Sequence, residues 1–125
     1  MSILIQRVND PFRSPEHYRI LIDRLWPRGI SKERAALDDW MKDIAPSTTL
    51  RKWFDHRTDR FEEFSIRYTQ ELQTDPTKQA CLHEILTQSK QRTVILLYAA
   101  KNPKINHAVV LLHVLQRMQD TSPIS

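Results

Sequence analysis

The chain contains a single glycine, Gly29, among its 125 residues, whereas average usage of about 7% would supply roughly nine. Glycine is needed where the backbone takes a positive φ or where another group must approach it closely. Gly29 closes the segment 23–29, which follows the apolar run 20–22 and carries two arginines and a tryptophan. We therefore expect either a positive φ or a close backbone approach at Gly29, and we expect the turn 23–29 to mark a site.

The length of the chain predicts one domain with one hydrophobic core. We expect this domain to span residues 1–120 and the tail 121–125, which has turn residues and no periodicity, to fray. The formal net charge is +4, and the isoelectric point is near 9.5. A charge of this size is ordinary for a soluble protein, and it is also compatible with an anionic partner.

Cysteine usage and hydropathy indicate a cytoplasmic protein. Cys81 is the only cysteine, so neither a disulfide framework nor a Cys-x-x-Cys zinc site can form within one chain. The first seven residues hold too short an apolar run for a signal peptide, and no apolar stretch approaches the ~20 residues of a membrane helix. We expect no membrane association. The sequence leaves cofactors and oligomeric state open.

Apolar patterns predict strands over 3–8, 18–23 and 93–98. The runs 20–22 and 94–97 are apolar without alternation, which favours strands covered on both faces and hence a parallel or mixed sheet. The segment 37–44 is ambiguous, because it fits either a short strand or an extended connector.

Capping residues and 3.6-residue periodicity predict the helices. They begin at Ser31, Ser47, about Asp59, Asp75 and Asn106. The order of elements predicts a single-domain α/β layered fold, with a mostly parallel or mixed sheet of about three to five strands flanked by helices.

Two basic loops leave the carboxyl ends of buried strands, where α/β proteins bind ligands. If strands 18–23 and 93–98 are parallel neighbours, we expect Arg24, Arg28 and Lys101 to converge. The helix start at Asn106 adds N–H donors and a partial positive charge. Lys32 would add positive charge, and Trp26 would form one wall of the pocket. The sequence therefore predicts a pocket for a small anionic or phosphorylated ligand.

A second cluster surrounds the predicted helix start at Ser47. Ser47 and Arg51 could contribute donors to the same ligand, and Tyr68 and His107 are the candidates for proton transfer. Structural roles are the alternative for several of these residues. Ser47 would then be a helix cap and Tyr68 a core residue, and Arg24 would pair with a buried carboxylate such as Asp23 or Glu71.

Other chemistries fit the sequence less well. The five histidines include no i, i+4 pair suited to a metal, and a Gly-rich phosphate loop cannot be built from one glycine. No Gly-x-Ser-x-Gly motif is present, and Cys81 lies on the apolar face of a predicted helix. Enzymatic activity is left open.

The alternative function is a nucleic-acid-binding accessory protein that contacts the phosphate backbone. Basic residues lie near aromatic ones over 24–34 and 51–60, although Glu33, Asp55 and Asp59 interrupt them. A third possibility is a protein-interaction module, which would show an exposed apolar patch.

The motif Arg-Leu-Trp-Pro-Arg-Gly at 24–29 resembles the DUF488 family, in its YeaO-like branch. The resemblance extends from about residue 7 to 115 and includes Ala-Pro-Ser at 45–47, Leu-Arg-Lys-Trp-Phe at 50–54, Arg-Tyr at 67–68, Tyr-Ala-Ala-Lys at 98–101 and Asn-His-Ala at 106–108. It implies a small bacterial α/β protein with a site at these motifs, and it implies no reaction. Asn102 departs from the aspartate that members often carry at this position, which weakens any model that needs a carboxylate there.

Overall fold

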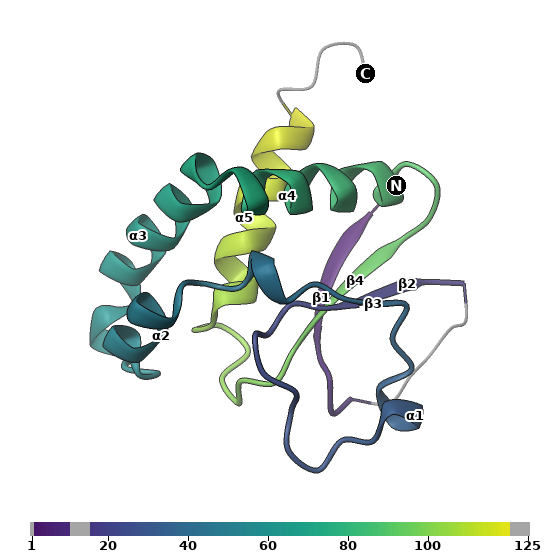
Figure 1. Cartoon of the computed structure of the whole chain (residues 1–125), viewed down its shortest axis with the longest axis horizontal. Coiled ribbons are helices and arrows are strands. Elements are labelled where there is room, and N and C mark those ends of the chain that lie inside the picture. The colour runs from purple at the N-terminus through teal and green to yellow at the C-terminus, as the bar shows by residue number, and fades with distance from the viewer. Residues whose placement is uncertain (1, 11–15, 121–125) are drawn as a thin grey trace.

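Four parallel strands form one sheet in the order β1-β4-β2-β3 (Figure 1). The computed structural model describes residues 2–10 and 16–120, so the tail predicted to fray lies outside the described residues. The strands are β1 (Ile3–Arg7), β2 (Tyr18–Leu21), β3 (Asp39–Trp40) and β4 (Val94–Tyr98). The predicted α/β fold with a parallel sheet is confirmed.

The central position of β4 explains its apolar sequence. Leu96 pairs with Ile5 of β1 on one side and with Ile20 of β2 on the other, and every residue of β4 is buried. The ambiguous segment 37–44 contains both a two-residue edge strand, β3, and a 3₁₀ turn at Lys42–Ile44. The predicted second strand is two residues too long, although the amide of Ile22 still donates to the Leu97 carbonyl at 3.0 Å.

Five helices complete the domain, and the first of them lies apart from the others (Figure 1). They are α1 (Lys32–Ala35), α2 (Thr48–Phe54), α3 (Phe61–Thr74), α4 (Pro76–Ser89) and α5 (His107–Asp120), with a further 3₁₀ turn at Thr58–Arg60. Alternate residues of the strands pack into two separate hydrophobic cores. Ile20 and Leu96 belong to the larger core with α2 to α5, whereas Leu21 and Leu97 belong to a smaller core with α1.

The predicted helix caps are confirmed by their hydrogen bonds. The Ser47 hydroxyl accepts from the Leu50 amide at 3.2 Å, and Asp75 accepts from the Thr77 amide at 2.9 Å. Asn106 accepts from an amide in the first turn of α5 at 3.2 Å. Each cap satisfies a donor that the helix itself leaves without a partner.

Cys81 lies on the apolar face of α4, as the sequence predicts: it is half-buried and packs against the core with the fully buried Leu82 and Ile85. Lys78 is buried as well, and its ammonium donates to the carbonyls of Asp43 at 2.8 Å and Ala45 at 2.7 Å. These two carbonyls lie in and after the 3₁₀ turn that precedes α2, so α4 holds that turn through a buried lysine.

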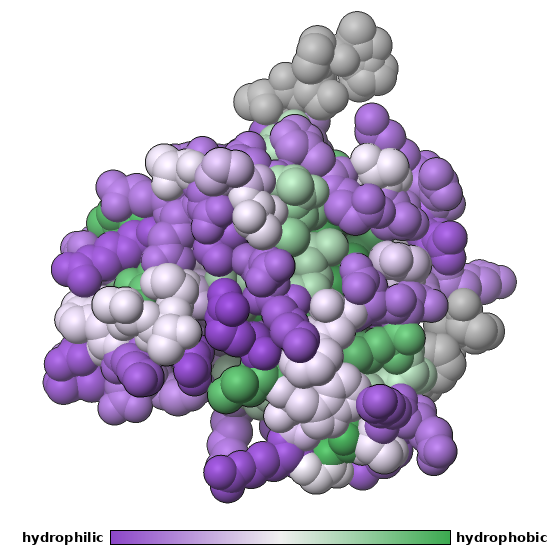
Figure 2. Space-filling view, in the orientation of Figure 1, coloured by the Kyte–Doolittle hydropathy of each residue, from purple (hydrophilic) through white to green (hydrophobic). Residues whose placement is uncertain are grey.

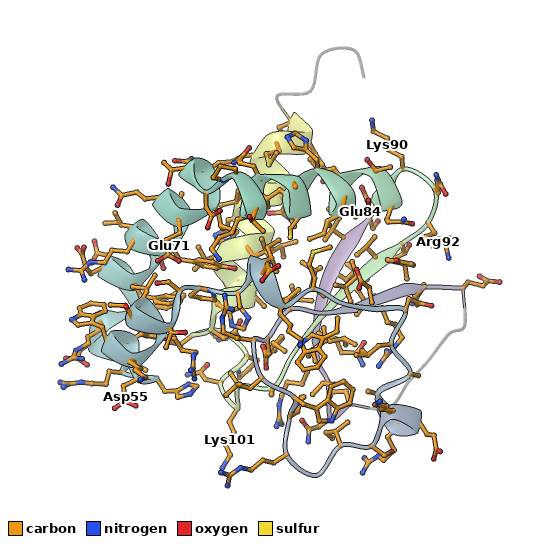
Figure 3. All side chains as sticks on the ribbon, viewed as in Figure 1. Asp55, Glu71, Glu84, Lys90, Arg92 and Lys101 are labelled. Carbon is orange, nitrogen blue, oxygen red and sulfur yellow. The ribbon has the colours of Figure 1, made fainter. Side chains whose placement is uncertain are left out.

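The surface is mostly hydrophilic, with charges of both signs. Figure 2 shows, on the face that it views, apolar side chains in small groups separated by hydrophilic ones. Figure 3 shows the acidic Glu84 on α4 and the basic Lys90 and Arg92 just after the end of this helix. Asp55 likewise follows α2, which carries the basic residues Arg51 and Lys52.

Gly29 has a φ of +75°, which is one of the two reasons for a glycine that the sequence leaves open. A Cβ added at this position would meet no described atom within 4 Å, so the requirement for glycine comes from backbone conformation and not from crowding. We expect Gly29→Ala to lower the free energy of unfolding by about 1 kcal/mol. Urea unfolding measures this, and an unchanged midpoint would show that alanine takes the left-handed conformation here at no cost.

Candidate functional site

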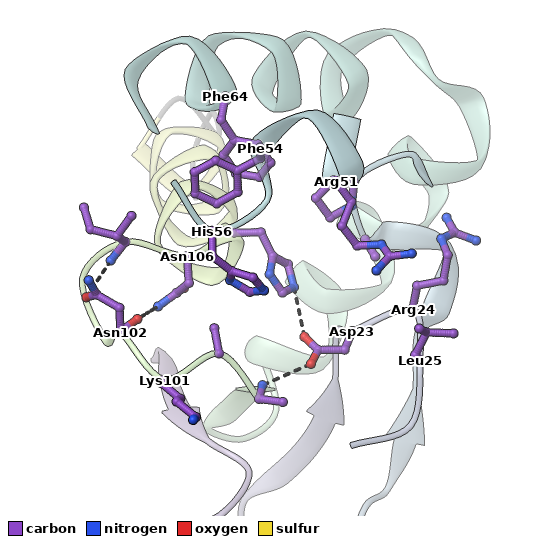
Figure 4. A pocket seen from close by; sticks show the side chains of 16 residues that line it. Asp23, Arg24, Leu25, Arg51, Phe54, His56, Phe64, Lys101, Asn102 and Asn106 are labelled. Carbon is purple, nitrogen blue, oxygen red and sulfur yellow. Dashed lines mark hydrogen bonds and ion pairs between the residues drawn. The ribbon is translucent and has the colours of Figure 1, made fainter. Parts of the chain in front are cut away.

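A pocket of about 550 Å³ opens at the carboxyl ends of β2 and β4, next to the start of α5 (Figure 4). The loop after β2 contributes Asp23, Arg24 and Leu25 to its lining, and the loop after β4 contributes Ala99, Ala100, Lys101, Asn102 and Ile105. The start of α5 contributes Asn106 and His107, and α3 contributes Phe64. The segment around α2 contributes Ala45, Pro46, Arg51, Phe54 and His56.

Three cations surround this pocket. Figure 4 shows Arg24 and Arg51 together on one side and Lys101 on the other. None of the three forms an ion pair with another residue in the described part of the chain. The Nε atom of Arg24 is buried and has no hydrogen-bond partner among residues 2–10 and 16–120. Guanidinium groups supply planar pairs of donors that suit phosphate and carboxylate oxygens, so this rim can hold an anion.

Asp23 is the one carboxylate of the lining, and each of its oxygens lies close to another group of the protein. One oxygen accepts from the amide of Ala99 at 3.0 Å, which ties the loop after β2 to the loop after β4. The other lies 3.2 Å from Nε2 of His107. The sequence interpretation considered Asp23 only as a partner for Arg24. Its position directly after a buried strand was a signal that could have placed it in the site.

His107 is held by two acceptors. Its Nε2 lies 3.1 Å from the carbonyl of Ile22 and 3.2 Å from the Asp23 carboxylate. Because both partners are acceptors, Nε2 carries the ring proton when the histidine is neutral. The ring also meets Tyr68 edge to face, with centroids 6.2 Å apart. His107 is therefore held in a fixed orientation beside the Asp23 carboxylate.

His56 reaches the pocket from an unusual turn. Asp55 and His56 have positive φ values of 46° and 54°, a conformation that costs energy for residues other than glycine. His56 is exposed in this turn and also lines the pocket. No periodicity marks a left-handed pair, so the sequence carried no signal that this turn would place a histidine beside the pocket.

Of the predicted site residues, Arg24, Arg51, Lys101, Asn106 and His107 line this pocket. Asn106 has a structural role as well, because its amide nitrogen donates to the Asn102 carbonyl at 2.8 Å while its oxygen caps α5. The side chain of Asn102 accepts from the amides of Lys104 and Ile105 at 2.9 and 3.1 Å. An aspartate could make both bonds, so the departure from the family pattern preserves this loop.

The other predicted site residues lie outside the lining. Arg28 and Lys32 are exposed. Trp26 packs against the smaller core, where its indole donates to the Ile30 carbonyl at 2.6 Å. The hydroxyl of Ser47 donates to Glu71 at 2.6 Å, and the same carboxylate accepts from the Ser47 amide at 2.8 Å.

Tyr68 is fully buried, and its hydroxyl donates to the Ile44 carbonyl at 2.6 Å. Burial raises the pKa of this phenol well above its usual value, and the nearby Glu71 and Asp23 carboxylates raise it further. A phenol that stays protonated at high pH and donates to a buried carbonyl is poorly suited to proton transfer near neutrality.

We expect Tyr68→Phe to cost about 1 kcal/mol of stability at pH 7, because the Ile44 carbonyl loses its donor. The phenol ionises near pH 10 in the unfolded chain and only at higher pH in the folded one, so its contribution to stability falls as the pH rises above about 10. Stability measured across pH 8–11 should therefore fall less steeply for Tyr68→Phe than for the parent. Equal slopes would show that Tyr68 does not control alkaline unfolding.

The fold and the pocket define a small parallel α/β protein with a basic site at the carboxyl ends of its strands. The chain belongs to the DUF488 family: the family model described as the inactive DUF488-N3 subclade matches residues 2–123.

Relatives resemble this chain over most of its length. It is 45% identical over 111 residues to the uncharacterized protein YeaO of Escherichia coli K12, a match that covers 89% of this chain and 94% of that protein. It is 34% identical over 113 residues to the uncharacterized protein Rv3073c of Mycobacterium tuberculosis H37Rv, covering 90% of this chain and 92% of that protein. No solved structure matches the chain significantly.

Two further searches of the structure bear on the class of site. Among residues 2–10 and 16–120, no group of three or more histidine, cysteine, aspartate or glutamate side chains is arranged to hold a metal ion. None of the helices in these ranges is long and apolar enough to cross a membrane.

Proposed function

We propose that the protein binds a small anionic ligand, inorganic phosphate or a phosphorylated compound, in the pocket between the loops that follow β2 and β4. The observation that carries the proposal is the convergence of Arg24, Arg51 and Lys101 from three separate elements. Their charges repel one another, and the lone carboxylate of the lining is engaged by Ala99 and His107. An anion bound among the three cations would remove this repulsion.

The proposal is for binding, with no reaction assigned. The matching family model is described as an inactive subclade, and this description supports a protein that holds a ligand without converting it. Within this proposal, His107 rather than Tyr68 is the group that could exchange a proton with the ligand. His107 lines the pocket beside Asp23, whereas the hydroxyl of Tyr68 is bonded to a buried carbonyl.

Calorimetric titration with phosphate tests the proposal through matched pairs of variants. We expect Arg24→Ala and Arg51→Ala each to weaken phosphate binding by about tenfold or more, because each removes a charged hydrogen-bond donor. Arg28→Ala and Lys52→Ala are the controls, since both residues are exposed, lie close in sequence to the targets and do not line the pocket. Equal losses in targets and controls, or no loss in the targets, would contradict the proposal.

The nucleic-acid alternative makes a different prediction. It requires a continuous basic surface, and its binding should weaken steeply with salt. The labelled charges of Figure 3 include Asp55 and Glu84 as well as lysines and arginine, and no observation specifically favours this alternative. A band shift of duplex or single strands at low salt that is lost as salt rises would support it.

A further inference from the structure

The lining of the pocket is divided into three regions of different chemistry. The cations Arg24, Arg51 and Lys101 form its rim, the Asp23–His107 pair forms a polar region between them, and apolar side chains fill much of the remainder. We propose that the ligand is a phosphate monoester of an uncharged, largely apolar alcohol, with the phosphate at Arg24 and Arg51. This inference rests on the proposed function and names the class of ligand.

Charge balance favours a dianion with a single charged end. Arg24, Arg51 and Lys101 together with Asp23 contribute two net positive charges to the lining, which matches a doubly ionised phosphate monoester. Figure 4 shows Asp23 between the arginine pair and Lys101. A second anionic group on the ligand would approach this carboxylate and be repelled. The rest of the ligand is therefore uncharged.

An apolar body is favoured by Leu25. Its side chain is 62% exposed, one of three exposed large hydrophobic residues in the described part of the chain, and it lines the pocket beside Arg24 (Figure 4). Phe54 and Phe64 stack on each other with centroids 4.2 Å apart and add aromatic surface to the lining. Inorganic phosphate would leave the apolar surface of Leu25 in water, whereas an organic monoester would cover it.

The remaining contacts suit the uncharged end of such a ligand. The Asp23–His107 pair can accept or donate a hydrogen bond, which suits a hydroxyl or amide on an otherwise apolar body. The cavity of about 550 Å³ lies within the range of roughly 300–1,000 Å³ typical of small-molecule sites. A phosphate ion alone would leave most of this volume unfilled.

Calorimetric titration of the full chain with phenyl phosphate and with inorganic phosphate tests the inference. We expect phenyl phosphate to bind at least about tenfold more tightly than inorganic phosphate, because burying part of the phenyl ring supplies enough free energy for a tenfold difference in affinity. Leu25→Ser should weaken the binding of phenyl phosphate more than that of inorganic phosphate, and so reduce the ratio of the two affinities. Ile66→Ser is the matched control, because Ile66 is also exposed, at 50%, and lies on α3 away from the lining.

A third ligand tests the single charged end. 1,4-Phenylene diphosphate carries the same ring with a second phosphate, and we expect it to bind more weakly than phenyl phosphate. Equal affinities for phenyl phosphate and inorganic phosphate, with binding still lost in Arg51→Ala, would overturn this inference and leave the proposed function standing. If neither compound binds, the proposed function fails and the inference with it.

Discussion

We expect Phe64→Ala to lower the free energy of unfolding by about 3–5 kcal/mol, the largest effect of any substitution considered. Phe64 is 1% exposed and stacks on Phe54 with a centroid separation of 4.2 Å. Its ring also lies 5.8 Å from that of Tyr68 and 6.1 Å from that of Phe61. Truncation removes this apolar contact and leaves a cavity where α2 and α3 pack together.

Urea unfolding at pH 7 measures this effect. Phe64→Leu is the control, because leucine refills most of the volume and should cost only about 1–2 kcal/mol. A loss below about 1 kcal/mol for the alanine variant would show that the aromatic cluster can collapse around the cavity. Because Phe64 also lines the pocket, binding should be measured at temperatures where the variant is fully folded.

We expect Asp23→Ala to lower the free energy of unfolding by about 2–4 kcal/mol. The substitution leaves the amide of Ala99 without its acceptor and removes the carboxylate beside His107. The same substitution should strengthen phosphate binding, because it removes the single negative charge of a lining that includes three cations. Stability and affinity should thus change in opposite directions.

Asp23→Asn separates the two effects. Its amide oxygen can still accept from Ala99, but its NH₂ group would face the protonated Nε2 of His107. We expect a loss of stability smaller than that of Asp23→Ala, together with tighter phosphate binding in both variants. Unchanged stability of Asp23→Ala by urea unfolding, or weaker phosphate binding by calorimetry, would contradict this account.

Local physical chemistry made much of the fold predictable from the sequence. Glycine at position 29 indicated a positive φ because no other residue takes that conformation without cost. Ser47, Asp75 and Asn106 marked helix starts because their side-chain oxygens satisfy amides that the helix leaves free. The uninterrupted apolar run of β4 indicated a strand buried on both faces. Each of these features depends on a few neighbouring residues, so each could be predicted without the tertiary structure.

The site depended on where those elements meet. The parallel pairing of two strands predicted that Arg28 would lie with Arg24 and Lys101, but Arg28 does not line the pocket. Asp23 was missed as a site residue although its place after a buried strand was a signal. Its position beside His107 could not be predicted, because sequence patterns do not record long-range pairs. His56 lies beside the pocket because its turn has a left-handed backbone conformation. Lys78 is buried because its ammonium donates to two carbonyls of a segment distant in sequence.

The sequence by itself determined most of the helices and strands, the α/β class and the two loops at which a site would form. These follow from periodicity, capping and the parallel sheet, whose carboxyl ends share one edge. Only the tertiary structure decided which basic side chains share a pocket and that Asp23 accepts a hydrogen bond from Ala99 and lies beside His107. It also decided that Tyr68 is buried outside the lining of this pocket. Those facts depend on side-chain direction and on contacts between distant segments, which arise from packing of the whole chain.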